Sequence, residues 1–139
     1  MSVLLVRHAS AGNRKSWTGD DRLRPLDERG RREAEGLVDA LAGYHITRVV
    51  TSPYVRCHQT VEPLAAARGL QVEERDELAE GASRQEALAL LAEPGTGAFC
   101  THGDVVEMLL GEESPKGSTW ILHVDAGEVV PLEYVGPAA

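Results

Sequence analysis

The chain has 139 residues, of which 42% are hydrophobic and 26% charged, and its formal net charge at pH 7 is −8. This length predicts a single domain over residues 1–139 that buries most of its surface on folding. The acidic balance argues against a nucleic-acid partner, because such binding depends on neutralising phosphates. With no apolar run near the roughly 18 residues of a spanning helix and no signal peptide after Met1, we expect a cytoplasmic protein that does not bind membranes.

The charge is distributed unevenly along the sequence. Residues 1–32 hold eight basic and four acidic side chains, a balance of +4, whereas the remaining residues have a balance of −12. A positive patch on an acidic body suggests a focused site for a small anion. The alternative is an accidental cluster of basic residues on an exposed loop and helix.

The first predicted element is a strand over residues 3–6. Its four apolar residues run directly into Arg7 and His8, which is typical of a buried parallel strand that delivers two polar side chains to the edge of a sheet. In open α/β sheets this edge is where ligands bind. The alternative is a strand that simply ends, with Arg7 in solvent. A polar loop over residues 9–25 follows, and loops of this length are usually functional or mobile.

Strands and helices then alternate. Asp27 is the expected N-cap of the first helix, Ser52 and Pro53 are the expected N-cap and first residue of the second, and Pro63 predicts a kink or break in it near Glu62. The patterns predict helices over about 27–43, 52–68, 83–92 and 103–111, and strands over about 46–51, 70–73 and 98–101.

The last part of the chain changes character. Residues 120–125 and 128–134 are apolar-rich and lie on either side of Ala126 and Gly127, which predicts a β-hairpin. Pro131 places the last strand at an edge. The order of elements predicts an α/β fold with a mainly parallel sheet, helices on both faces and an antiparallel edge.

Three predicted strands end near side chains suited to phosphate, namely His8 with Arg7, Arg56 and His102. The carboxyl ends of parallel strands share one edge, so these residues could converge on one pocket. Arginine matches phosphate oxygens, and a neutral histidine can attack phosphorus to leave a covalent phosphohistidine. Nearby arginines should lower the pKa of His8 and favour this neutral form.

This chemistry requires no metal, and we predict no cofactor. The sequence has no Walker-type G-x-x-x-x-G-K motif, no H-E-x-x-H motif and no carboxylate cluster suited to magnesium. Cys57 and Cys100 lack the C-x-x-C spacing of a metal or redox site and are too few for a disulfide framework. We expect two reduced, buried thiols.

Three segments, Leu5–Ala9, Ser52–Arg56 and Thr101–Asp104, closely resemble the signature segments of the histidine phosphatase superfamily. That family includes cofactor-dependent phosphoglycerate mutases and small phosphohistidine phosphatases. The segment Arg24–Gly30 is similar to the small-phosphatase branch and to the phosphatase domain fused to some Nudix enzymes. The resemblance covers about residues 3–110. It implies a three-layer α/β/α sandwich of the phosphoglycerate mutase-like type.

The resemblance also implies roles for individual residues. His8 would be the phosphorylated nucleophile, and the phosphoryl group would be bound by Arg7, Arg56 and His102. The acid that protonates the leaving oxygen would be Glu80, in the segment Leu78-Ala79-Glu80, with Glu77 as the alternative. The remainder of an anionic substrate could be held by Arg14, Lys15, Arg22 and Arg24.

The favoured function is a metal-independent phosphatase that hydrolyses a phosphomonoester or phosphoramidate through a phosphohistidine on His8. Its substrate would be a phosphorylated small molecule or a phosphohistidine protein. Two alternatives stay open: a mutase-type phosphotransferase acting at the same site, and a non-catalytic module that binds phosphorylated ligands. Ser10 stands where mutases usually have glutamate, which disfavours the mutase.

Overall fold

The computed structural model describes residues 2–138. Its strands are β1 (Ser2–Arg7), β2 (Arg48–Thr51), β3 (Val72–Glu74), β4 (Gly97–Thr101), β5 (Thr119–Asp125) and β6 (Glu128–Val135). Its helices are α1 (Glu28–Ala40), α2 (Val55–Arg68), α3 (Arg84–Leu91) and α4 (Gly103–Leu110), with short 3-10 helices η1 (Arg14–Ser16), η2 (Asp21–Leu23) and η3 (Asp76–Leu78).

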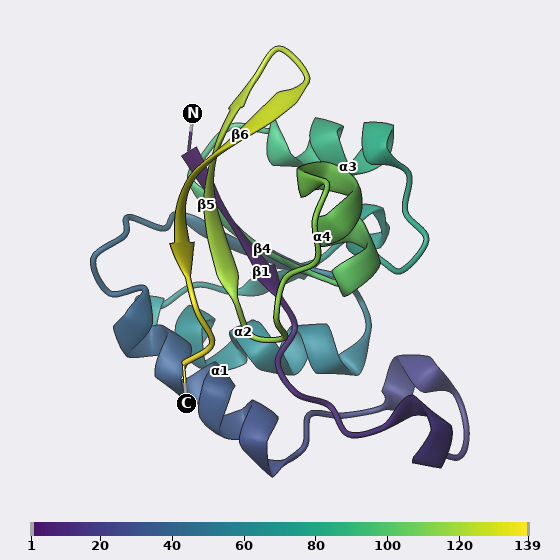
Figure 1. Ribbon diagram of the computed structural model, residues 1–139. Helices are drawn as coiled ribbons and strands as arrows, with labels where there is room; N and C mark the ends of the chain where they lie inside the picture. Colours follow the sequence, from purple (N-terminus) through teal and green to yellow (C-terminus); the bar gives the residue numbers. More distant parts are fainter. Residues whose placement is uncertain (1, 139) are drawn as a thin grey trace.

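The six strands form one sheet in the order β3-β2-β4-β1-β5-β6. β1, β2, β3 and β4 pair in parallel, whereas β5 pairs antiparallel with both β1 and β6. Helices α1 and α2 cover one face, and α3 and α4 cover the other (Figure 1). The predicted three-layer sandwich with an antiparallel edge is therefore confirmed.

The apolar run in β1 is explained by burial on both faces. Val3 and Leu5 belong to the core shared with α3 and α4, whereas Leu4 and Val6 belong to the core beneath α1 and α2. Successive side chains of a strand point to opposite faces, so a central parallel strand reads as continuously apolar. This burial fixes the register of β1 and therefore the position of the residues that follow it.

Caps are present at three helix ends, including the predicted cap Asp27. Asp27 Oδ1 accepts the Gly30 N–H at 2.8 Å at the start of α1, and Ser83 Oγ accepts the Glu86 N–H at 3.1 Å at the start of α3. Gly111 ends α4 with φ of +80°, a conformation that glycine adopts without strain. These caps supply partners for backbone groups that a helix terminus otherwise leaves free.

Two predictions about α2 were wrong. Ser52 and Pro53 precede the helix, whose N-cap is Tyr54, because the Ser52 N–H still bonds to the Cys100 carbonyl of β4 and extends the sheet. Pro63 lies inside α2 without breaking it. Pro63 has no N–H to donate within the helix, so one backbone hydrogen bond of α2 is lost. The next residue, Leu64, is fully buried in the core, and this packing stabilises the helix at that point.

Gly30 permits α1 to lie against the loop that follows His8. A Cβ at Gly30 would stand 1.9 Å from the Ser10 carbonyl oxygen. We expect Gly30→Ala to lower the free energy of unfolding by at least about 2 kcal/mol, as measured by urea denaturation. A Cβ at Gly43 would meet no atom within 4 Å, so Gly43→Ala is the control, with an expected change of about 0.5 kcal/mol or less. Equal losses in the two variants would contradict this account.

Candidate active site

The carboxyl edge of the sheet gathers the predicted site residues. Arg7 ends β1 and His8 follows it, Arg56 is the second residue of α2 after β2, and His102 follows β4. Because β1, β4 and β2 are neighbouring parallel strands, their ends lie together. The rings of His8 and His102 are 5.5 Å apart, and Glu80 Oε1 lies 3.7 Å from His102 Nδ1.

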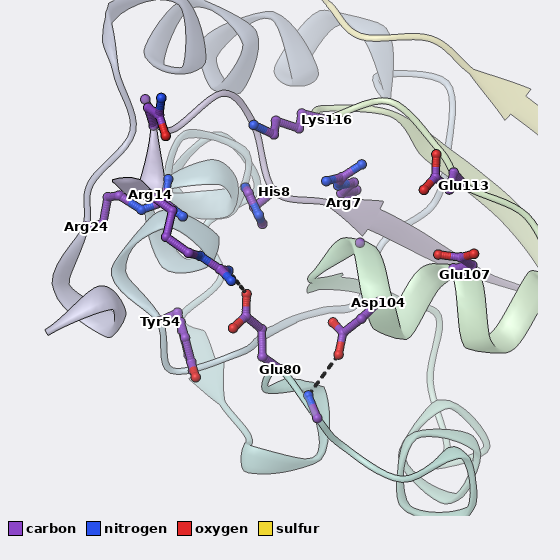
Figure 2. A pocket seen from close by; sticks show the side chains of 14 residues that line it. Arg7, His8, Arg14, Arg24, Tyr54, Glu80, Asp104, Glu107, Glu113 and Lys116 are labelled. Carbon is purple, nitrogen blue, oxygen red and sulfur yellow. Dashed lines mark hydrogen bonds and ion pairs between the residues drawn. The ribbon is translucent and has the colours of Figure 1, made fainter. Parts of the chain in front are cut away.

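A cavity of about 1120 Å³ opens over this edge (Figure 2). Its walls include three predicted site residues, Arg7, His8 and Glu80, together with Gly12, Asn13, Arg14, Arg24, Tyr54, Gly81, Gly103, Asp104, Glu107, Glu113 and Lys116. Arg56 and His102 lie deeper, with 0% and 1% exposure, in contact with Tyr54 and Glu80. Of the four basic residues predicted to hold the rest of a substrate, Arg14 and Arg24 line the cavity, whereas Lys15 and Arg22 do not.

His8 is held in one tautomer. Its Nδ1 lies 2.8 Å from the carbonyl oxygen of Ala9, which can only accept, so Nδ1 carries the proton and Nε2 has a lone pair. The pKa of His8 is lowered to about 3, chiefly by burial and to a smaller extent by repulsion from His102, Arg56 and Arg7. The pKa of His8 is therefore lowered, as expected, but burial contributes more to this shift than the arginines do. The side chain at the cavity wall is a neutral imidazole.

Arg7 is fixed by two contacts. Its Nη1 donates to the Ser114 carbonyl at 2.5 Å, and its guanidinium packs closely on Gly103, where a Cβ would stand 2.7 Å from Cζ. Its Nε is buried and has no hydrogen-bond partner among residues 2–138. A guanidinium with an unused donor at the wall of a cavity is suited to an anionic ligand.

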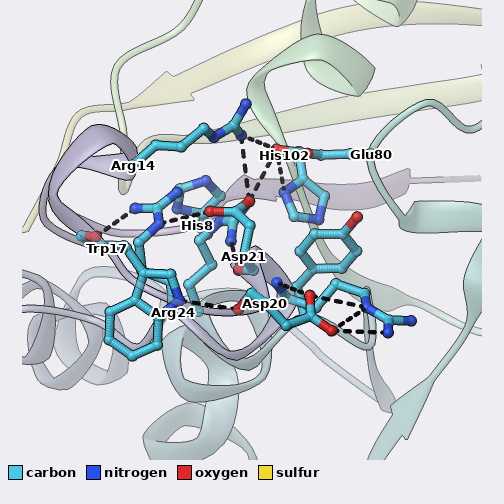
Figure 3. A network of polar contacts seen from close by, with 12 residues as sticks. His8, Arg14, Trp17, Asp20, Asp21, Arg24, Glu80 and His102 are labelled. Atoms are coloured by element: carbon cyan, nitrogen blue, oxygen red, sulfur yellow. Dashed lines mark hydrogen bonds and ion pairs between the residues drawn. The ribbon is translucent and has the colours of Figure 1, made fainter.

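Arg56 is covered by the carboxylates of Asp21 and Glu80. Both carboxylates belong to the network of polar contacts in Figure 3. Its Nη1 donates to the Asp21 carbonyl oxygen at 2.8 Å, and its Nη2 donates to Asp21 Oδ2 at 3.1 Å and to Glu80 Oε1 at 2.9 Å. Glu80 Oε1 also accepts from Arg14 Nη2 at 2.6 Å. A phosphate that binds Arg56 must therefore take the place of carboxylate oxygens that already bind it.

His102 is oriented by Ser52. Its Nε2 lies 2.9 Å from Ser52 Oγ, and Ser52 Oγ also accepts the Tyr54 N–H at 3.3 Å. When the Ser52 hydroxyl donates to Nε2, the His102 proton sits on Nδ1, the atom on the Glu80 side. Burial, followed by repulsion from Arg56 and Arg14, lowers the pKa of His102 to about 3. A neutral His102 thus offers one N–H donor next to Arg56.

The two candidate acids are placed differently. Glu80 lines the cavity, whereas Glu77 does not and is bound by Arg75 at 2.6 Å. Of the two candidate acids, Glu80 is therefore the one that reaches the site.

Several residues at the site were assigned no role from the sequence. Ser52 and Tyr54 belong to the segment that contains Arg56, so the motif itself pointed to them. Asp21 and Lys116 lie in non-periodic loops, where residue type was the sole signal. Within residues 2–138, no group of three or more His, Cys, Asp and Glu side chains could hold a metal ion. None of the described helices has the length and apolar character of a membrane span.

Comparison with known proteins identifies the family. Residues 3–89 match the sequence model of the histidine phosphatase superfamily (branch 1), and the chain belongs to this superfamily, as predicted. An 8-oxo-(d)GTP phosphatase from Mycolicibacterium smegmatis is 39% identical over 155 residues. The match covers 98% of this chain and 48% of that protein, so the chain spans about half the length of this relative.

Solved structures agree on the fold. The protein histidine phosphatase SixA complexed with tungstate superposes with a TM-score of 0.81 at 24% identity, covering 99% of this chain and 97% of SixA. A phosphoserine phosphatase mutant from Entamoeba histolytica in complex with phosphoserine gives a TM-score of 0.73 at 14% identity, covering 96% and 95%. These likenesses confirm the phosphoglycerate mutase-like fold.

The two buried histidines should make stability depend on pH. Their pKa is about 3 in the folded chain and near 6.5 in an unfolded one, so between these values the unfolded chain binds more protons. The free energy of unfolding should therefore fall as the pH drops below about 6.5, by up to about 1.4 kcal/mol per pH unit for each histidine. Urea denaturation between about pH 5 and pH 8 measures this slope.

His8→Asn should reduce that slope, because it removes one of the two groups. His45 is exposed, so His45→Asn is the control. If wild type and His8→Asn have the same slope, His8 is not buried in its neutral form.

Proposed function

We propose that this chain is a metal-independent phosphatase that passes a phosphoryl group first to His8 and then to water. The observation that supports this proposal best is the neutral His8 imidazole, whose Nδ1 is engaged by Ala9 and whose Nε2 is left for attack beside the cationic wall of the cavity. We further propose that residues 1–139 form one catalytic domain. The two free, buried cysteines fit a reducing compartment such as the cytoplasm.

The first step forms one bond and breaks another. His8 Nε2 attacks phosphorus, the bond from phosphorus to the leaving atom breaks, and its electron pair stays on that atom. Arg7, Arg56 and the Nδ1–H of His102 would bind the phosphoryl oxygens, where negative charge is spread in the transition state. Such fixed donors contribute through electrostatic stabilisation and positioning, which is most of what phosphoryl transfer requires.

The second step returns the enzyme to its starting state. Water attacks the phosphohistidine and gives a proton to the Glu80 carboxylate, the N–P bond breaks, and the electron pair returns to Nε2 with release of inorganic phosphate. The phosphoryl group would hold Arg56 during both steps, so Asp21 and Glu80 would be displaced from it. Glu80, once displaced from Arg56 by the phosphoryl group, takes up a proton and is the proposed donor of that proton to the leaving atom.

Two substrate classes are supported by the comparisons. One relative is an 8-oxo-(d)GTP phosphatase, and one structural neighbour is the protein histidine phosphatase SixA. The cavity volume of about 1120 Å³ is at the upper end for small-molecule sites, so a nucleotide-sized ligand would fit. We favour a phosphorylated small molecule, with a phosphohistidine protein as the second candidate. Phosphate transfer from a primed bisphosphate would indicate a mutase instead.

Replacement of the nucleophile tests the proposal. Wild-type protein should release phosphate from p-nitrophenyl phosphate in excess EDTA, and His8→Asn should lower kcat/KM by at least about 10³-fold. His58 contacts Glu74 through Nδ1 at 2.9 Å and does not line the cavity, so His58→Asn is the control and should keep full activity. An acid-labile, base-stable phosphate label should form on wild type and not on His8→Asn. Undiminished turnover by His8→Asn would refute the proposal.

The role of Glu80 depends on the leaving group. Glu80→Gln should lower kcat/KM for phosphoserine, whose alkoxide needs a proton, by about 10²-fold to 10³-fold. The loss for p-nitrophenyl phosphate, whose phenolate leaves readily, should be below about 10-fold. Glu77→Gln is the matched control. Equal losses for the two substrates would show that Glu80 positions Arg14 and Arg56 without donating a proton.

A further inference from the structure

Lys116 stands on a turn that is attached to the end of β1. The Ser118 N–H donates to the Pro115 carbonyl at 3.1 Å, and Gly117 has φ of +80°, the pattern of a type II turn with Lys116 at its second position. The Gly117 N–H also points at the carbonyl oxygens of Arg7 and His8, at 3.1 and 3.0 Å. The backbone therefore fixes Lys116 beside the proposed nucleophile.

The ammonium group of Lys116 has no partner among the residues that the structure describes, although it lines the cavity next to His8 (Figure 2). Two other cations there are paired with carboxylates, Arg14 with Glu80 and Asp21, and Arg24 with Asp21, whereas Arg7 donates to the Ser114 carbonyl. Asp27, the carboxylate that attracts Lys116, is beyond ion-pair distance, because it holds Ser10 and the N-terminus of α1.

The surroundings of Lys116 carry excess positive charge. Burial, and then repulsion from Arg7 and Arg24, lowers its pKa, and Asp27 opposes this shift only in part. Lys116 is exposed, so solvent reduces this repulsion, but no carboxylate of the described residues lies within ion-pair distance of its ammonium group. The turn thus keeps at the cavity wall a cation that is available to an anionic ligand.

The opposite wall of the cavity is acidic. Asp104, Glu107 and Glu113 lie on α4 and in the segment after it, beyond Arg7 in Figure 2. A substrate with a second negative group would be repelled from this wall and attracted to Lys116. The charge distribution therefore favours one orientation of the substrate in the cavity.

We infer that Lys116 binds a second phosphate of the substrate, and that the substrates are oligophosphate esters such as nucleoside diphosphates. This inference rests on the phosphatase activity proposed above. The terminal phosphorus is attacked by His8 Nε2, its bond to the bridging oxygen breaks, and the electron pair stays on the departing phosphate. Lys116 neutralises the charge that develops on that phosphate, whereas a monoester or a phosphohistidine side chain has no group for Lys116 to bind.

The test compares adenosine and guanosine 5′-diphosphates with the corresponding monophosphates. Wild type should prefer the diphosphate in kcat/KM, and Lys116→Gln should reduce the diphosphate-to-monophosphate ratio by about 10-fold or more, the value of one charge-assisted contact. Lys15, the other lysine of the chain, is exposed and does not line the cavity. Lys15→Gln should leave the ratio unchanged.

A binding measurement separates this inference from the proposed activity. In the His8→Asn background, pyrophosphate should raise the melting temperature more than phosphate does, and Lys116→Gln should remove the difference. An unchanged ratio with equal stabilisation by the two anions overturns the inference, even if monoesters are hydrolysed. Loss of all turnover with selective pyrophosphate binding retained would overturn the phosphatase and leave the second-phosphate site standing.

Discussion

The fully buried guanidinium of Arg56 is the interaction on which the site depends. An uncompensated charge at this depth would cost several kcal/mol, and it is compensated by Asp21 and Glu80 and by the Tyr54 ring, whose centre lies 4.9 Å from Cζ. These contacts join α2 to η2 in the loop over residues 9–25 and to the segment after η3. The long polar loop is therefore held in place by a charge at the centre of the site, in addition to the small apolar cluster that Ala9 and Ala11 form with Leu26 and Ala34.

The same contacts link the geometry of the site to the proposed chemistry. Carboxylate oxygens on Arg56 occupy donors that a phosphoryl group would use, so the folded chain carries its own anions until a ligand arrives. Binding then exchanges one set of charge-assisted hydrogen bonds for another, and the buried Arg56 is never left without a counter-ion. The arrangement also explains why Asp21 stands in a basic segment: its carboxylate neutralises Arg14, Arg24 and Arg56 together.

The sequence predicted the placement of the site better than its internal structure. His8, Arg56 and His102 could be assigned to one edge because each follows a buried parallel strand, and parallel strands end on the same side. Other features of the site were not predictable from the sequence. These are the deep burial of Arg56 and His102, the contact of Ser52 with His102 in place of a helix cap, and the contacts of Asp21 and Lys116. They depend on side-chain contacts between loops that have no periodic sequence pattern. Strands and helices, in contrast, can be recognised because their apolar residues recur with periods of 2 and 3.6 residues.

His8, the proposed nucleophile, is held almost entirely by backbone groups. The His8 N–H donates to the Thr101 carbonyl at 3.0 Å, its carbonyl accepts from Gly117, and Ala9 is anchored in turn through its N–H to Thr60 Oγ1 at 3.0 Å. With Nδ1 bound to Ala9, the imidazole has one nitrogen left for a ligand. The basic side chains around it are paired with carboxylates that a phosphoryl group would displace, so the proposed site combines a fixed imidazole with exchangeable counter-ions. Preorganisation of this kind places the reacting atom before the substrate binds, and the reorganisation is confined to Asp21 and Glu80 at the mouth of the site.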